Sequence, residues 1–184
     1  FLIDDGAEFN YYASDVTRTY PVSGKFNPTQ KRIYQKVLDL QKELISLAKP
    51  GYTFNQMQDH TISVLVDIML DEGLLKGSKD KIIADGEFKR FYPHGVGHLL
   101  GMDVHDVGLY ESGGEPRGLE PGVCITIEPG IYIPQTAADV PDELRGVGIR
   151  IEDNILITAD GNENLTAAIP KEIDELEAII GSKA

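Results

Sequence analysis

Five side chains of the kinds that bind divalent metal ions lie in four distinctive motifs spread over most of this chain. Two of them, Asp4 and Asp15, stand eleven positions apart in I-D-D-G-A-E-F-N-Y-Y-A-S-D. The others are His98 in H-G-V-G-H-L-L-G-M-D-V-H-D, Glu128 in T-I-E-P-G-I-Y and Glu152 in R-I-E-D-N. Four carboxylates and one imidazole form a hard, oxygen-dominated donor set. A shared site requires a fold that brings both ends of the chain together.

Composition sets the class of protein. With 184 residues, 41% of them hydrophobic and 26% charged, the chain fits one globular domain over residues 1–184. A net charge of -13 repels nucleic-acid phosphates and anionic membrane surfaces, so we expect neither as a partner. No run of residues is apolar enough to span a bilayer.

The single cysteine and the first residue bear on the compartment and on the length of the protein. Cys124 has no partner for an internal disulfide and lies in the apolar run Val123 to Ile127, so we predict a buried, unreactive thiol and a reducing, cytoplasmic compartment. Phe1 begins inside an expected strand, without an initiator Met or a targeting peptide. We therefore expect a fragment whose N-terminal part is missing.

The first half of the chain predicts a hairpin and two helices. Two short β-type runs flank Gly6 and carry Asp4 and Asp15, which antiparallel pairing would bring to within about 5 Å of each other. Asn27 and Pro28 are typical of a helix start, and Lys49-Pro50-Gly51 ends the apolar stripe that follows. Thr53 with Gln56 predicts a capping box for a second helix, which Gly73 ends.

The second half predicts strands, loops and a last helix. Strands are expected over Val123 to Glu128 and Gly148 to Thr158, and an amphipathic helix over Lys171 to Ile180. Alternation in the later strand places four isoleucines (149, 151, 155 and 157) on one face and Arg150, Glu152 and Asn154 on the other. The segments Glu111 to Glu120 and Asp139 to Glu143 are expected to be solvated loops.

The motifs together resemble those of the metallopeptidases of the creatinase or pita-bread fold, family M24, and most of all their Xaa-Pro aminopeptidase branch. The Asp-Asp pair, the long histidine motif, I-E-P-G-I-Y and R-I-E-D occur here in the order of that family and cover nearly the whole chain. The resemblance implies an α+β fold, with a curved, mostly antiparallel sheet and helices on its outer side. It also implies that upstream helices and a strand of the domain are missing here, and that the full-length protein is a homo-oligomer.

The resemblance also implies roles for individual residues. Asp15 and Glu152 would bridge two divalent ions, Asp4 would complete the shell of one ion, and His98 and Glu128 that of the other. Mn²⁺ is the expected metal, with Co²⁺ or Zn²⁺ possible for this donor set. Two such ions lower the pKa of a bound water from 15.7 to about 7. The remaining catalytic and positioning residues are Glu128 as general base, His94 and His105 in the pocket, and Tyr132 and Arg150 as groups that orient the ligands.

The implied substrates are peptides with proline at the second position. A bond before proline has no amide hydrogen and a fixed φ, so it requires a dedicated pocket, for which Phe91, Tyr92 and Tyr132 are candidate walls. The segment Gly95-Val96-Gly97 lacks the following Lys-Ser/Thr of a phosphate loop and is better interpreted as backbone that lets His94 and His98 approach the metals.

Three other readings stay open. An Xaa-Pro dipeptidase (prolidase) is the first, although the separation of only 24 residues between Glu128 and Glu152 favours the aminopeptidase branch. Methionine aminopeptidases share the fold and the ligand types but match I-E-P-G-I-Y and R-I-E-D less well. The third is a non-catalytic pita-bread binding module, which the presence of all five donors disfavours.

Overall fold

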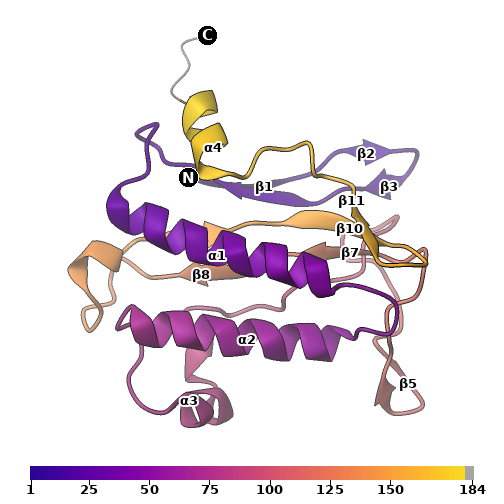
Figure 1. The fold of residues 1–184 in the computed structure, drawn as a ribbon, viewed down its shortest axis with the longest axis horizontal. Helices are drawn as coiled ribbons and strands as arrows, with labels where there is room; N and C mark the ends of the chain where they lie inside the picture. The colour runs from indigo at the N-terminus through magenta and orange to yellow at the C-terminus, as the bar shows by residue number, and fades with distance from the viewer. Residues whose placement is uncertain (181–184) are drawn as a thin grey trace.

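The computed structural model describes residues 1–180 and begins with the expected hairpin (Figure 1). Four short strands lie in chain order: β1 (Leu2–Asp5), β2 (Glu8–Phe9), β3 (Tyr12–Ala13) and β4 (Val16–Thr19). β1 pairs antiparallel with β4, and Asp4 lies opposite Thr17, while β2 and β3 form a smaller hairpin in the connection. Asp15 directly precedes β4, so the pairing brings both aspartates to the same end of the β1–β4 ribbon.

Two long helices follow, α1 (Pro28–Leu47) and α2 (Phe54–Asp71). The predicted helix start at Asn27 and the predicted capping box of Thr53 with Gln56 are confirmed: the side chain of Asn27 accepts a hydrogen bond from the backbone of Gln30, and that of Thr53 from the backbone of Gln56. Such a cap stabilises a helix by about 1 kcal/mol. Gly73 was expected to end α2 and follows the last turn of this helix. Its φ of 69° is the left-handed conformation that glycine commonly adopts at the end of a helix.

The second half of the chain supplies the remaining strands, β7 (Cys124–Ile127), β8 (Gly130–Tyr132), β9 (Gly148–Arg150), β10 (Asp153–Ile157) and β11 (Asn162–Asn164). The single strand expected over Gly148 to Thr158 is therefore wrong. β9 pairs with β8, whereas β10 pairs with β7 and β11, all antiparallel. The ladder breaks between them because the backbone N–H of Glu152 donates to the carbonyl of Thr17 on β4, at 3.1 Å.

Shorter elements complete the chain: α3 (Lys79–Asp85), η1 (Glu87–Arg90), β5 (Glu111–Ser112), β6 (Glu115–Pro116), η2 (Asp142–Leu144) and α4 (Ile173–Ile180). The pair β5 and β6 lies in a segment expected to be an irregular loop, where Gly113 and Gly114 adopt positive φ and allow a tight turn. Within the described residues, no helix is long and apolar enough to cross a membrane.

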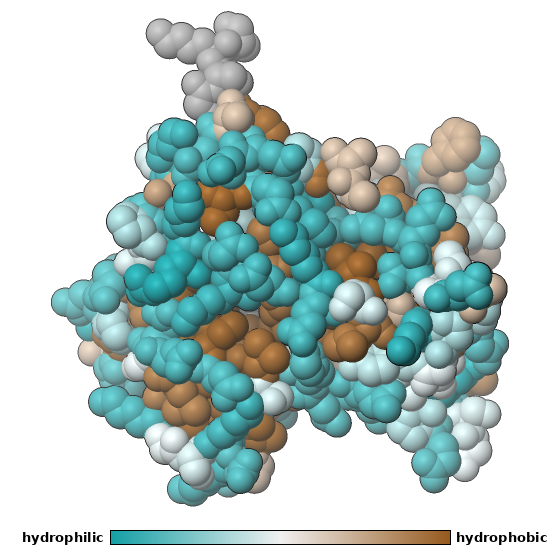
Figure 2. All heavy atoms as spheres, in the orientation of Figure 1, coloured by the Kyte–Doolittle hydropathy of each residue, from teal (hydrophilic) through white to brown (hydrophobic). Residues whose placement is uncertain are grey.

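The helices α1 and α2 lie side by side on one side of the strands, and most of the core lies between these two layers (Figure 1). Ile125 and Ile127 of β7 are fully buried, and Asp153 of β10 faces α1, where Gln41 donates to it at 2.9 Å. Neighbouring residues of a strand point to opposite sides. Thr126 and Glu152 therefore face away from the helices. Figure 2 shows that the outer surface of the helix layer is mostly hydrophilic, with smaller apolar areas between the polar groups.

A buried ionic cluster joins the helix layer to β4 and β10. The carboxylate of Asp153 is fully buried and pairs with Arg18 at 2.7 Å and with Lys171 at 2.5 Å. Arg18 is itself 2% exposed and also donates to the carbonyl of Glu152 at 2.5 Å. The pKa of Asp153 would be raised by its burial, but the charges of Arg18 and Lys171 hold it below its usual value. This cluster fixes the backbone from which Glu152 projects.

Candidate metal centre

The register of the strands brings the carboxylates together. Asp153 pairs with Ile127, so Glu152 and Glu128 occupy the next opposite positions where β10 and β7 meet the rest of the sheet. The β1–β4 hairpin contributes Asp4 and Asp15 from the side, since Asn154 accepts a hydrogen bond from the backbone N–H of Asp15 at 3.1 Å. The carboxylates of Asp4, Asp15, Glu128 and Glu152 thus meet on the face of the sheet that points away from α1.

His98 is placed by an extended segment that runs alongside β7. The backbone N–H groups of Leu100, Thr126 and Glu128 donate to the carbonyls of Cys124, His98 and Val96 at 3.0, 2.9 and 2.8 Å, so residues 96–100 continue the sheet. The ring of His98 lies close to carboxylates from two separate parts of the chain. Its Nε2 lies 3.3 Å from Asp15 Oδ2 and 3.5 Å from Glu128 Oε1.

The five donors form overlapping groups in which one atom of each residue lies within 4.8 Å of the others. One group contains His98, Glu128 and Glu152, and another contains Asp4, Asp15 and Glu152. Two adjacent groups that share Glu152 are the arrangement that two neighbouring ions with a common carboxylate require. A third group joins Asp15 and His98 to His105, whose ring lies 4.4 Å from the ring of His98. The structure therefore brings all five residues together.

One atom tests whether these residues fit metal ions. Glu152 is 1% exposed, and its Oε2 accepts a hydrogen bond from the hydroxyl of Thr17 at 2.6 Å. Its Oε1 is also buried and has no hydrogen-bond partner among the described residues. An unpaired buried carboxylate oxygen costs free energy unless a cation compensates it. Because Oε1 belongs to the residue shared by two donor groups, the donor set fits divalent metal ions.

The protonation of the cluster shows how the charges interact without a cation. Burial raises the pKa of Glu152 to about 8, and the charge of Glu128 adds to this effect. Burial also raises the pKa of Glu128, although the charges of His98 and Arg150 oppose it. Burial would raise the pKa of Asp15, but hydrogen bonds with His98 and Asp4 outweigh it and lower that pKa. Divalent cations would relieve the repulsion among these carboxylates.

A pH dependence of stability follows for the metal-free protein. Between the unfolded pKa of Glu152, 4.5, and its folded value of about 8, the folded state keeps a proton that the unfolded state has lost. The free energy of unfolding should therefore fall as the pH rises through this window. Urea unfolding in EDTA at pH 5, 6, 7 and 8 measures the slope, and Glu152→Gln, which cannot titrate, is expected to flatten it. An equal slope in the variant would contradict this assignment.

The residues expected to support the ligands form a connected line. Arg150 Nη2 donates to Asp4 Oδ2 at 2.5 Å, and its Nη1 donates to the hydroxyl of Tyr132 at 3.3 Å. That hydroxyl lies 2.7 Å from Nε2 of His94, whose Nδ1 is 3.8 Å from Glu128 Oε2. Burial lowers the pKa of His94, which favours the neutral imidazole at pH 7. The structure therefore brings Arg150, Tyr132 and His94 together beside two of the candidate donors, Asp4 and Glu128.

The sequence did not indicate the hydroxyl groups of Thr17 and Thr126. Thr17 Oγ1 contacts Asp4 Oδ1 at 3.1 Å and Glu152 Oε2 at 2.6 Å, and it accepts from Arg150 Nε at 2.9 Å. Thr126 Oγ1 donates to Glu128 Oε1 at 3.2 Å and accepts from the backbone of His98 at 3.0 Å. The only available signal was their alternation with the acids, Thr126 two residues before Glu128 and Thr17 two after Asp15.

Other expectations about the surroundings need correction. Phe91 is fully buried in the hydrophobic core, so it does not form a wall of an open pocket. Tyr92 is also buried, at 1% exposure. Its ring contacts the ring of His94 in an edge-to-face arrangement, with 4.8 Å between the two ring centroids. Cys124 is half-buried rather than buried, and its side chain lines a cavity on the same face as the candidate centre.

Of the two glycines in Gly95-Val96-Gly97, only Gly97 lies in close contact with another strand, β7. A Cβ atom at Gly97 would lie 2.0 Å from the carbonyl oxygen of Thr126, whereas a Cβ at Gly95 meets nothing closer than 3.9 Å. Gly97→Ala must therefore push residues 96–98 away from β7, at a cost of about 1–3 kcal/mol, and displace His98. We expect at least tenfold weaker Mn²⁺ binding by isothermal titration calorimetry, with Gly95→Ala close to wild type. Equal affinities of the two variants would show that this contact does not position His98.

Comparison with known proteins gives a consistent result. The sequence profile described as "Metallopeptidase family M24" matches residues 1–159. The Xaa-Pro aminopeptidase of Haemophilus influenzae is 50% identical over 179 residues, which are 97% of this chain and 41% of that protein. The structure of Pseudomonas aeruginosa aminopeptidase PepP superposes with a TM-score of 0.93 at 46% identity, over 97% of this chain and 40% of that one.

A zinc-substituted Escherichia coli aminopeptidase P in complex with product is also similar, with a TM-score of 0.90 at 45% identity over 97% of this chain and 40% of that one. The chain thus spans about 40% of the length of the proteins that it matches. The matched part contains every one of the five candidate donors, from residue 4 to residue 152.

Proposed function

Because this chain belongs to metallopeptidase family M24 and has the pita-bread fold, we propose that the protein containing it is a metal-dependent Xaa-Pro aminopeptidase, which releases an N-terminal residue that precedes proline. The observation that carries the proposal is the convergence of Asp4, Asp15, His98, Glu128 and Glu152. Glu152 belongs to two of the donor groups, and its buried Oε1 has no partner among residues 1–180. A binding module without metal would have no use for such a cluster, whose uncompensated charges destabilise the fold.

In this proposal Asp15 and Glu152 would be the ligands that two divalent ions share. Asp4 would be a further ligand of one ion, and His98 and Glu128 would be further ligands of the other. The overlapping donor groups support this division, because Asp4 shares a group with Asp15 and Glu152 while Glu128 shares one with His98. The donor set suits Mn²⁺, which we propose as the metal, although the same ligands also accept Co²⁺ or Zn²⁺.

The ions would supply a hydroxide at neutral pH and positive charge to stabilise an oxyanion. The residues of the chain do the rest. Glu128 accepts the proton of the attacking water and passes it to the leaving proline nitrogen, which needs a proton because it becomes a free amine. His94 and His105 hold the substrate from opposite sides of the centre.

The orienting groups keep these residues in place. The guanidinium of Arg150 touches Asp4 and the hydroxyls of Tyr132 and Thr17, so it restrains Asp4, one of the proposed ligands. Tyr132 in turn fixes His94 through its hydroxyl. Groups that hold the ligands in this way are typically worth 10–100-fold in metal affinity or activity.

The experiment compares three peptides with the full-length protein. An Xaa-Pro-Yaa tripeptide, an Xaa-Pro dipeptide and Met-Ala-Ser are each incubated with the protein in EDTA and again after addition of Mn²⁺. Release of the first residue from the tripeptide only in Mn²⁺ is the expected result. Cleavage of the dipeptide alone would replace the aminopeptidase by a prolidase, and release of Met from Met-Ala-Ser instead would indicate a methionine aminopeptidase. Binding of metal without cleavage of any peptide would leave a binding module.

A further inference from the structure

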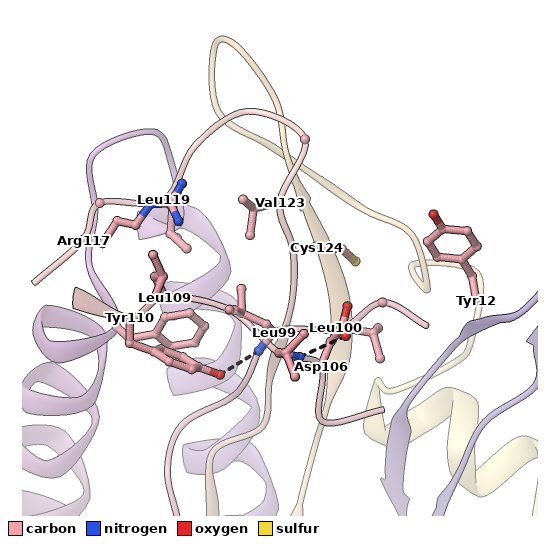
Figure 3. A pocket seen from close by; sticks show the side chains of 16 residues that line it. Tyr12, Leu99, Leu100, Asp106, Leu109, Tyr110, Arg117, Leu119, Val123 and Cys124 are labelled. Carbon is pink, nitrogen blue, oxygen red and sulfur yellow. Dashed lines mark hydrogen bonds between the residues drawn. The ribbon is translucent and has the colours of Figure 1, made fainter. Parts of the chain in front are cut away.

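A cavity of about 400 Å³ opens beside the metal centre, within the usual range for ligand pockets. It is lined mainly by apolar groups, among them Leu99, Leu100, Val107, Leu109, Leu119, Val123 and Cys124, with Tyr12 and Tyr110 at its sides. Figure 3 shows Leu119, Val123 and Leu109 around one end, and Cys124 between this end and the ring of Tyr12. None of the proposed catalytic residues lines it.

The cavity and the metal centre lie along one strip of the sheet. Cys124 and Thr126 on β7 and Glu128 directly after it alternate onto the same face, and on the neighbouring segment His98 and Leu100 do the same. The strip therefore begins with Glu128 and His98 at the metals and ends with Cys124 and Leu100 at the cavity. Measured from Glu128 to Cys124, the two ends are four residue steps apart, a distance of about 13 Å.

The loop between the two ends also connects them. His105 belongs to a donor group of the centre, whereas the next residues, Asp106 and Val107, line the cavity. The side chains of Val107 and Leu109 are 86% and 67% exposed, so the rim offers apolar surface that faces water. Apolar surface next to a catalytic centre is characteristic of a binding groove.

We propose that this cavity binds an apolar side chain of the peptide substrate at its fourth or fifth residue. This proposal rests on the proposed function. An aminopeptidase places a single residue before the cleaved bond, so only the C-terminal part of its substrate extends away from the metals. An extended peptide advances by about 3.3–3.6 Å per residue, so the fifth residue reaches the cavity and the fourth reaches its near rim. The protein would then prefer peptides of at least four residues to tripeptides.

A position scan tests the proposal. Hexapeptides that begin with Ala-Pro and continue with glycine receive one leucine at position 3, 4, 5 or 6, and kcat/KM is measured with the full-length protein and Mn²⁺. We expect an increase of about tenfold for leucine at position 4 or 5 over the all-glycine peptide, and little at position 3 or 6. Equal values at all four positions would overturn the proposal.

Matched variants locate the effect. Val107→Ser/Leu109→Ser removes the rim and should abolish the advantage of leucine. Val22→Ser changes a residue that is 84% exposed and lies at a different cavity, so it should keep the advantage. An advantage that survives in the double variant would contradict the proposed location.

Alkylation of Cys124 gives an answer that does not depend on cleavage. Burial raises the pKa of this thiol, so labelling by iodoacetamide is followed at pH 9, with EDTA present, and quantified by mass spectrometry of the peptide that contains residue 124. The hexapeptide with leucine at its preferred position, or at position 5 when no peptide is cleaved, should slow labelling at least threefold relative to the all-glycine peptide. If no peptide is cleaved but labelling slows, the proposed function fails and the cavity remains a peptide site. Equal labelling rates would overturn the cavity as a peptide site.

Discussion

Glu128→Gln is expected to lower kcat for Xaa-Pro-Yaa cleavage by at least about 10³-fold, because loss of a general base alone removes about 10²–10⁴-fold. The amide keeps the shape of the side chain but can neither accept the proton of water nor contribute a full charge to the metals. Glu128 Oε1 and Oε2 lie 3.5 Å from His98 Nε2 and 3.8 Å from His94 Nδ1, so its carboxylate lies between these two rings.

The variant should fold normally. Burial raises the pKa of Glu128, which means that the charged form is unfavourable without metal, so a neutral amide should leave the metal-free protein at least as stable as before. Glu120→Gln is the matched control, since Glu120 is exposed and pairs only with Arg117 at 2.9 Å among the described residues. Activity of Glu128→Gln within tenfold of wild type would remove Glu128 from the chemistry.

Asp153→Asn is expected to destabilise the protein by about 3–5 kcal/mol, the cost of leaving a buried charge without its partner. The carboxylate is fully buried and accepts from Arg18, Gln41, Asn164, Thr166 and Lys171 at distances between 2.5 and 3.0 Å. An asparagine would leave the guanidinium of Arg18, only 2% exposed, without a negative charge. Urea unfolding of the metal-free protein measures the change.

The same substitution at an exposed pair provides the control. Asp139 accepts two hydrogen bonds from Arg90, at 2.5 and 2.7 Å, but both side chains are solvent-exposed. Water screens such a pair, so Asp139→Asn should change stability little. Because the pKa of Asp153 is depressed in the folded state, its contribution should be present above the unfolded pKa and disappear as the pH falls through the folded one. A loss below about 1 kcal/mol for Asp153→Asn, typical of exposed pairs, would contradict the account.

Local signals predicted the starts of α1 and α2 from sequence. Asn27 with Pro28 and the pair of Thr53 and Gln56 were readable because a cap involves residues at most three positions apart, whereas the short helix α3 was not predicted. The candidate donors were proposed because each belongs to a motif that resembles a known family. The α+β fold with antiparallel strands and helices on one side agrees with that expectation, and the structural comparison confirms it.

Features that depend on distant partners were not predictable in this way. Asp153 stands next to Glu152 in R-I-E-D, but its partners Arg18, Gln41 and Lys171 come from three separate parts of the chain. The sequence did not predict the break before β10. There the backbone N–H of Glu152 donates to the carbonyl of Thr17 on β4, but the alternation of isoleucines continues through the break. The half-exposed position of Cys124 follows from the neighbouring cavity, which the apolar run around it does not reveal.

Anomalous X-ray diffraction from crystals of the full-length protein with Mn²⁺ tests the central claim most directly. We predict two anomalous peaks about 3.5–4 Å apart, the usual spacing of a two-metal site. One peak should contact His98 and Glu128, and the other should contact Asp4. Both peaks should contact Asp15 and Glu152. A single peak, or peaks that leave Glu152 without a metal contact in crystals of active protein, would contradict the account.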